Sequence, residues 1–326
     1  MGSVESTSAE TSVSAAPKHE PATDPAAGVG DRRATWVVLA KAMRPHHWVK
    51  NLLVFAPVIF HHAVFDPWLM GLSTLAFVLF CATSSAIYLV NDVLDAKSDR
   101  KHPVKRFRPI ASGDLTMEVA LSVAGALLVA TVAVSTALLP WGFLATLVIY
   151  IVVNAAYSLW LKQKVMIDVV VLAAFYSLRI LAGGEATGIE PSEWLLALSL
   201  FLFLSLAFLK RYCELVRLRE EGALRTDDRG YRVVDIEMLQ TMGLACGYLA
   251  VLVLALYINS NQVVELYRHP RVVWLVCPLL LYWVSRTWIW AHRGAIHEDP
   301  VLFALRDRTS WIVVLLVVLL GIFATL

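Results

Sequence analysis

Four acidic or amide side chains lie within nine residues, at the end of a long apolar run. Asn91, Asp95 and Asp99 are spaced i, i+4 and i+8, and Asp92 precedes Asp95 by three positions. A helix that continues through them places all four on one side. Clustered carboxylates repel one another unless a cation lies between them, and hard oxygen ligands suit Mg²⁺, which also binds substrate phosphates. The spacing predicts a Mg²⁺–phosphate site; a solvated helix end is the structural alternative.

Five basic residues follow the carboxylates at once, in the stretch "RKHPVKRFRPIASG". They are Arg100, Lys101, Lys105, Arg106 and Arg108. A pyrophosphate that carries Mg²⁺ needs both signs of charge side by side, whereas a bare metal site does not. Positive-inside bias or contact with anionic lipid explains any single one of these residues equally well. We interpret the group as part of a pyrophosphate site, with Lys105 and Arg108 as candidate substrate ligands.

The elements that must position these residues are membrane helices. The chain has 326 residues, of which 58% are hydrophobic and only 17% charged, and this is too apolar for a soluble domain. We expect an all-α membrane protein with nine spans, because apolar windows of about 17–25 residues mark membrane helices. The expected spans are 47–63, 68–94, 115–137, 141–161, 165–184, 193–213, 238–259, 271–291 and 309–326. The first span is the least regular, because the polar residues Lys50 and Asn51 lie near its start and Pro57 interrupts it.

The segments outside the spans carry weaker signals. Residues 1–31 are rich in Ser, Thr, Ala, Glu and Pro and lack an apolar signal-peptide core. We therefore expect a disordered tail, followed by one transmembrane domain over 32–326. The stretch at about 34–43 has the pattern of an amphipathic helix on the membrane surface. The four cysteines show no metal-ligand spacing, and we interpret them as core thiols.

The distribution of Lys and Arg predicts the orientation. All but three of the 28 basic residues lie on the side of the N-terminus; the exceptions are Arg179, Arg268 and Arg271. By the positive-inside rule that side is the cytoplasm, and nine helices then leave the C-terminus outside the plasma membrane. The long polar connections, 95–114 and 214–237, lie on the same side. We therefore expect an active site at the cytoplasmic face.

The pattern Asn91-Asp92-x-x-Asp95-x-x-x-Asp99 followed by "RFRPIASG" resembles the first aspartate-rich motif of the UbiA superfamily of intramembrane prenyltransferases. The likeness extends over nearly all of residues 35–326. The resemblance implies a UbiA-like helical bundle and a Mg²⁺ ion at Asp95 and Asp99, assisted by Asp92 and Asn91. It also implies that Asp92, Asp95 and Asp99 are the catalytic residues.

The chain departs from that family after the sixth expected helix. Family members generally carry a second Asp-x-x-x-Asp motif there, whereas this chain reads "FLKRYCELVRLREEG", with Lys210, Arg211 and Glu214 at the corresponding place. Lys210 and Glu214 could be only a helix-surface ion pair. Cations in place of carboxylates would, however, contact a phosphate directly. The departure points away from an ordinary prenyl diphosphate donor.

A third stretch, "RPHHWVKN" at 44–51, places Arg44, Lys50 and Asn51 around a helix start, where a phosphate could bind. Together with the two motifs above, it resembles the decaprenyl-phosphate phosphoribosyltransferase branch of the UbiA superfamily. The resemblance implies phosphoribosyl pyrophosphate as donor, a polyprenyl phosphate as acceptor and a place in the synthesis of cell-wall arabinan precursors. A family-like interpretation also puts Tyr157, Lys162 and Asp168 near the donor, although simple ion pairing explains the last two equally well.

Other classes of function stay open at this point. The loop 225–235 could be a mobile lid or only a solvated loop. A prenyltransferase that acts on an aromatic quinone or haem precursor would need the second carboxylate pair that 210–214 lacks. A transporter should have polar residues near the middle of its spans, and here the charge gathers at one face. The short basic loops do not indicate nucleic-acid binding. The oligomeric state stays undetermined.

Overall fold

The computed structural model of the chain describes Gly2 and residues 36–101, 104–222, 229–260, 267–296 and 299–325. These residues form helices, short 3₁₀ turns and loops, with no β-strand among them. The expected tail, 1–31, lies outside the described residues apart from Gly2. The all-α fold predicted from the sequence is confirmed.

Eight helices are long and apolar enough to cross a membrane within the part of the chain that the structure describes. They are α3 (Pro67–Leu94), α6 (Met117–Leu138), α7 (Trp141–Leu159), α8 (Ile167–Thr187), α9 (Glu193–Glu220), α10 (Ile236–Ile258, preceded by η4, Val233–Asp235), α13 (Val276–His292, preceded by α12, Pro270–Val273) and α15 (Arg308–Thr325). Many large apolar side chains of these helices stay exposed, such as Leu315 and Phe323 on α15. In a membrane this apolar surface faces lipid, so the chain is an integral membrane protein.

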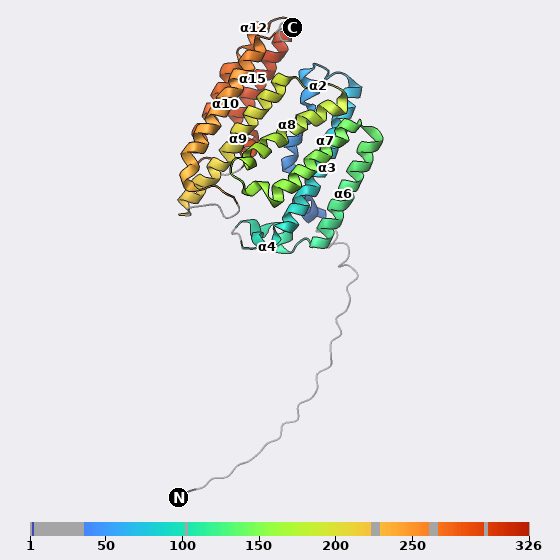
Figure 1. Ribbon diagram of the computed structural model, residues 1–326, viewed down its shortest axis with the longest axis vertical. Coiled ribbons are helices and arrows are strands. Elements are labelled where there is room, and N and C mark those ends of the chain that lie inside the picture. Colours follow the sequence, from blue (N-terminus) through green and yellow to red (C-terminus); the bar gives the residue numbers. More distant parts are fainter. Residues whose placement is uncertain are drawn as a thin grey trace.

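The helices pack as two neighbouring groups (Figure 1). In the first group α3 packs against α6 and α8, and α7 packs against α8; in the second, α9 packs along α10, which packs against α13. Contacts between α8 and α9 join the groups. Each group has its own apolar core, around Phe80 and Phe143 in the first and around Phe208 and Trp288 in the second. The blue and green helices of Figure 1 form the first group, and the yellow, orange and red helices form the second.

The first expected span, 47–63, is not a regular membrane helix. It consists of a 3₁₀ helix, η1 (Pro45–Phe55), followed by the short α2 (Ala56–Phe60). At about 2.0 Å per 3₁₀ residue and 1.5 Å per α residue, the segment covers roughly 30 Å, which matches the hydrocarbon thickness of a bilayer. It runs from the α4 end of the bundle to the opposite end, where α12 also lies (Figure 1). Among the described residues the structure thus has eight helices that could cross a membrane and this shorter, tighter segment, so nine membrane helices are not confirmed.

A close backbone approach explains how η1 fits between α3 and α8, which it contacts along its length. A Cβ atom added at Gly183 of α8 would lie 2.0 Å from the carbonyl oxygen of Val54. Only glycine leaves room for the backbone of η1 at this point. Before η1, residues 36–42 are helical, and Leu39 and Ala42 are buried near Ala86 and Leu89 of α3. This agrees with a helix at 34–43; its place on the membrane surface stays a prediction.

Short helices and 3₁₀ turns lie within several of the connecting loops. The helical hydrogen bonds continue past α3, since the Asp95 N–H donates to the Asn91 carbonyl and the Asp99 N–H to the Asp95 carbonyl. The elements that follow α3 are α4 (Ala96–Asp99), η2 (Lys105–Phe107) and α5 (Pro109–Ser112); η3 (Leu161–Gln163) precedes α8, and α14 (Pro300–Arg306) precedes α15. The expected continuation of the helix through Asp99 is therefore largely confirmed.

Candidate functional site

Guanidinium groups hold two of the three predicted carboxylates. Arg44, at the start of η1, donates to both oxygens of Asp92 over 2.6 and 2.8 Å. Arg108 donates to Asp99 over 2.6 Å and to Asp92 over 3.3 Å. Asp92 and Asp99 are both buried. The residues predicted from spacing thus lie together, and the downstream basic stretch supplies the cation that links two of them.

Asp95 differs from its neighbours because its side chain is 43% exposed. Its carboxylate lies 3.5 Å from the ammonium of Lys162, which was also predicted as a site residue. The amide oxygen of Asn91, one turn before, accepts a hydrogen bond from Ser158 over 2.9 Å. Lys105 begins η2 on the same loop as Arg108. Asp95 is therefore the carboxylate of the motif that a ligand can reach most readily.

The donor set has the right chemistry for Mg²⁺, since three carboxylates and an amide are hard oxygen ligands. Among the described residues, however, no group of three or more acidic, His or Cys side chains converges as a ready metal site. The ion pairs explain this, because Arg44 and Arg108 occupy the oxygens of Asp92 and Asp99. The ligand types fit Mg²⁺. Asp95 is directly accessible, whereas the Asp99 carboxylate is also bound by Arg108.

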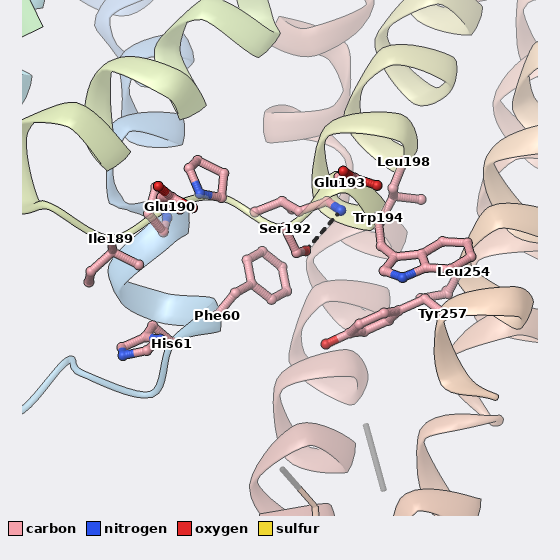
Figure 2. Close-up of a pocket in the computed structure, with 13 residues that line it drawn as sticks. Phe60, His61, Ile189, Glu190, Ser192, Glu193, Trp194, Leu198, Leu254 and Tyr257 are labelled. Atoms are coloured by element: carbon pink, nitrogen blue, oxygen red, sulfur yellow. Dashed lines mark hydrogen bonds between the residues drawn. The ribbon is translucent and has the colours of Figure 1, made fainter. Parts of the chain in front are cut away.

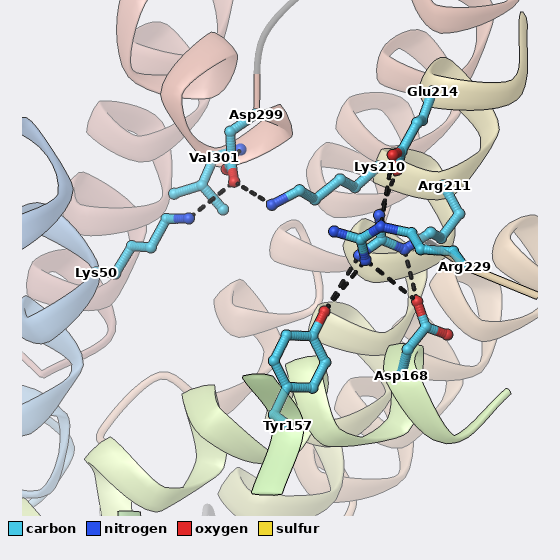
Figure 3. Close-up of polar contacts among 9 residues, drawn as sticks. All are labelled: Lys50, Tyr157, Asp168, Lys210, Arg211, Glu214, Arg229, Asp299 and Val301. Atoms are coloured by element: carbon cyan, nitrogen blue, oxygen red, sulfur yellow. Dashed lines mark hydrogen bonds and ion pairs between the residues drawn. The ribbon is translucent and has the colours of Figure 1, made fainter. Parts of the chain in front are cut away.

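A second cluster surrounds Arg211, which is buried near the end of α9. Its Nε donates to Asp168 over 2.7 Å, one Nη donates to Glu214, and the other donates to the Tyr157 hydroxyl over 3.3 Å. Arg229 approaches the same groups from the loop before α10, at 3.7 Å from Asp168 and 3.5 Å from Glu214 (Figure 3). The predicted residues of α7, α8 and α9 therefore form one network. Arg229 belongs to the candidate lid 225–235, of which Asp227 and Asp228 lie outside the described residues.

Tyr231 also belongs to this cluster. Its hydroxyl donates to Asp168 over 2.5 Å and accepts from the Met166 N–H over 2.9 Å. Burial, reinforced by the hydrogen bond to Asp168, raises the pKa of Tyr231 well above the ordinary value of a phenol. The Asp168 carboxylate is fully buried and has three partners. Asp168 therefore positions Arg211 and is not itself exposed to a ligand.

A third cluster links the beginning and the end of the chain. Lys50 of η1 and Lys210 of α9 both bind the Oδ2 atom of Asp299, over 2.8 and 3.2 Å (Figure 3). Burial alone would raise the pKa of Asp299, but the ammonium groups of Lys210 and Lys50 outweigh it and hold that pKa well below the usual range of a carboxyl. The two lysines were predicted as site residues. Asp299 was not among the predicted site residues, and its place between the two lysines was missed.

Asn51 faces away from the charged clusters. Its Oδ1 accepts a 2.8 Å hydrogen bond from Arg179, and its Nδ2 donates to Cys81 and Ser84. Because the Asn51 side chain is fully buried in this network, its role in this structure is to join η1 to α3 and α8. The expected contact between Asn51 and substrate has no support in this arrangement.

A cavity of about 760 Å³ lies at the other end of the bundle from α4. Phe60 and His61 line one side, and Trp194 and Tyr257 line the other (Figure 2). Among the described residues, its acidic lining consists of Glu190 and Glu193, and no Lys or Arg lines it. A phosphate would be repelled there. The cavity is thus separate from the three charged clusters.

The comparisons with known proteins agree with this architecture. The chain belongs to the UbiA prenyltransferase family, whose model matches residues 52–326. The structure of a UbiA homolog from Archaeoglobus fulgidus bound to GPP and Mg²⁺ is similar, with a TM-score of 0.63 over 87% of this chain and 99% of that chain. The two sequences are only 16% identical, so this likeness shows the fold. The chain is therefore an enzyme of a family that works in membranes.

Relatives with closer sequences carry different names. Nodulation protein NoeC of Azorhizobium caulinodans is 34% identical over 86% of this chain and 91% of its own length. Uncharacterized protein y4nM of Sinorhizobium fredii is 34% identical, and the match spans 83% of this chain and 52% of that protein. The decaprenyl-phosphate phosphoribosyltransferase of Corynebacterium glutamicum is 38% identical over 63% of each chain. The chain thus spans about half to two thirds of the length of two of these three relatives.

Proposed function

We propose that this enzyme transfers the 5-phosphoribosyl group of phosphoribosyl pyrophosphate to a polyprenyl phosphate, such as decaprenyl phosphate, and releases pyrophosphate. One observation carries the proposal: at Lys210 and Arg211 of α9 the chain has two cations where a second metal-binding carboxylate pair would serve a prenyl diphosphate. The similarity to the Corynebacterium phosphoribosyltransferase supports the same substrates.

Three clusters of Lys and Arg side chains supply the proposed phosphate contacts. A prenyl diphosphate has one anionic end, whereas the proposed pair of substrates has three separate ones: a pyrophosphate, a ribose 5-phosphate and a lipid phosphate. Among the described residues these clusters are centred on Arg108, Arg211 and Lys210, and each also contains carboxylates that pair with the cations. Direct contacts from Lys and Arg suit phosphates that are not bridged by metal.

The carboxylates of α3 and α4 are the proposed site for Mg²⁺, with Asp95 and Asp99 as ligands and Asp92 and Asn91 in support. When bound, the ion would neutralise charge that accumulates on the leaving pyrophosphate. Arg44 and Arg108 hold Asp92 and Asp99 in place and add positive charge beside that leaving group. Lys162, beside Asp95, adds a further cation from η3.

The proposed reaction is a single displacement at C1 of the ribose. The bond from C1 to the pyrophosphate oxygen breaks with its electron pair on the oxygen, and an oxygen of the lipid phosphate forms the new bond from the opposite face. The acceptor is already an anion, so no strong general base is required. The residues contribute by holding the donor and the lipid phosphate, which are both anions, close together despite their repulsion. Their contribution is therefore substrate positioning and electrostatic stabilisation.

The bilayer has a defined part in this proposal. The polyprenyl tail lies between helices or in the lipid. The site opens at the cytoplasmic face of the plasma membrane, so that water-soluble phosphoribosyl pyrophosphate can enter it from the cytoplasm. The product would enter the synthesis of cell-wall arabinan precursors. The alternative within the family is transfer of a prenyl group to an aromatic quinone or haem precursor.

One experiment separates the two activities. The full-length protein, purified in detergent with Mg²⁺, is given phosphoribosyl pyrophosphate and decaprenyl phosphate, and in parallel a prenyl diphosphate with an aromatic acid. Pyrophosphate release in the first reaction alone, with a phosphoribosylated lipid found by mass spectrometry, would support the proposal. Release in the second reaction alone would refute it and establish a prenyltransferase. Omission of Mg²⁺ should stop the reaction in either case.

A further inference from the structure

One carboxylate oxygen brings together two lysines from opposite halves of the bundle. Lys50 comes from η1 and Lys210 from α9, and both ammonium groups lie within hydrogen-bond distance of Oδ2 of Asp299. The two ammonium groups are thus no more than about two hydrogen-bond lengths apart. Without an anion between them they would repel strongly, because Lys50 and Asp299 are only 12% exposed and water screens them poorly.

The charges in this cluster do not balance. Two ammonium groups share one carboxylate, and within the described ranges no other carboxylate lies at ion-pair distance from either lysine. Among the described residues one positive charge is thus left without a carboxylate partner, beside side chains that are only 12% exposed, and a poorly solvated charge is costly. A phosphate monoester carries a charge of about −1.5 to −2 at pH 7 and would neutralise both lysines. Lys210 is 40% exposed, which leaves a route by which an anion can approach.

Asp299 is held from its other side by a helix end. Its Oδ1 accepts a hydrogen bond from the Val301 N–H over 3.1 Å and so caps the N-terminus of α14. The carboxylate therefore reaches the lysines because α14 presents it, as Figure 3 shows. Its two oxygens have separate tasks, since Oδ1 caps a helix and Oδ2 bridges two cations.

We propose that Lys50 and Lys210 form a phosphate-binding site in which the Asp299 carboxylate stands in for the ligand until a phosphate monoester displaces it. The stand-in prevents repulsion between the lysines in the empty enzyme and competes with the ligand, so it weakens binding. The ribose 5-phosphate of the donor and the phosphate of the lipid acceptor are both monoesters. Assignment of the site to either of them rests on the function proposed above.

The test measures binding of inorganic phosphate to the full-length protein in detergent by calorimetry, without Mg²⁺ and without turnover. Asp299→Asn should lower the Kd for phosphate about tenfold or more, because it removes the competing charge. Asp299→Ser should do the same and keep α14 capped, so it gives the result if the Asn variant unfolds. Adding Lys210→Met to either variant should abolish the gain.

Asp307→Asn is the matched control. It removes a carboxylate of similar burial, which forms a two-bond ion pair with Arg286. The phosphate Kd of this control should equal that of the unaltered protein. An unchanged or higher Kd in both Asp299 variants, or an equal gain in the Asp307 control, would overturn the proposal.

Steady-state kinetics of the Asp299 variants then identify the substrate. A lower KM for phosphoribosyl pyrophosphate alone would assign the ribose 5-phosphate to the site, and a lower KM for decaprenyl phosphate alone would assign the lipid phosphate. If both KM values stay unchanged while phosphate binds more tightly, the assignment to a substrate is wrong. If the protein transfers no phosphoribosyl group at all, the proposed function fails while the calorimetry still decides the phosphate site.

Discussion

The Nε atom of Arg179 donates a 2.8 Å hydrogen bond to Oδ1 of Asn51, inside the bundle and away from the charged face. Arg179 also donates to the Tyr150 hydroxyl and the Phe175 carbonyl, and within the described part of the chain no carboxylate forms an ion pair with it. A guanidinium held only by neutral groups depends on each of them, because any N–H left unpaired in the interior is costly. This contact fixes η1 against α8, and Lys50, the neighbour of Asn51, with it.

Asn51→Ala should therefore destabilise the protein by about 2–3 kcal/mol, because it leaves a charged donor without its acceptor. Thermal unfolding in detergent would show a lower midpoint. Asn259→Ala is the control, since the Asn259 amide is exposed and bonds only to the carbonyl one turn before. An equal midpoint for both variants would mean that Asn51 does not hold Arg179 in solution.

Asp95→Asn should reduce turnover roughly 100-fold or more while the unfolding midpoint stays unchanged. Its carboxylate is the exposed one of the motif and has a single, long ion pair, so its charge is available to a ligand and adds little to stability. Asp92→Asn should lower both turnover and stability, because it breaks two buried ion pairs. Asp114→Asn, an exposed carboxylate nearby, is the control for turnover. Near-normal activity of Asp95→Asn would remove the carboxylate site from the mechanism.

The Lys50–Asp299–Lys210 cluster should resist acid. The folded-state pKa of Asp299 is depressed, so its stabilising contribution is complete above the unfolded value of about 4 and is lost as the pH falls through the lower folded value. The difference in unfolding midpoint between the unaltered protein and Asp299→Asn should thus not shrink until the pH falls below about 4. A difference that shrinks already between pH 7 and 5 would contradict this prediction.

Gly183→Ala should prevent the close packing of α8 on η1. The added methyl group would meet the Val54 carbonyl at 2.0 Å, so one of the two backbones must move. We expect a lower unfolding midpoint and a lower yield of folded protein. Gly125→Ala on α6 meets no atom within 4 Å and should be neutral or slightly stabilising, as expected for Ala in a helix. Equal behaviour of the two variants would show that η1 can shift freely.

The fold was largely predictable because apolar windows report membrane helices directly. The exception was the first expected span, where a 3₁₀ helix covers a given length with fewer residues than an α-helix. The spacing of the α3 carboxylates also predicted their common location, because local helical geometry determines it. In η1 the α-helical period does not apply, so the direction of Asn51 could not be read from its neighbours.

The third cluster could not be predicted from spacing at all. Lys50 and Asp299 are 249 positions apart, and no local rule pairs them. A partial signal was present, since Asp299 followed by Pro300 is typical of the first turn of a helix. That pattern predicts the cap of α14. It does not predict that the second oxygen of the same carboxylate reaches two lysines.

The order of synthesis gives this cluster a further consequence. Both lysines are translated before Asp299, so while the 89 positions from Lys210 to Asp299 are made the growing chain contains both ammonium groups without the carboxylate that pairs with them. We therefore expect close packing of the two helix groups at this point to become favourable once Asp299, or another anion, lies between the lysines. Asp299 thus completes a site whose first lysine was made 249 positions earlier.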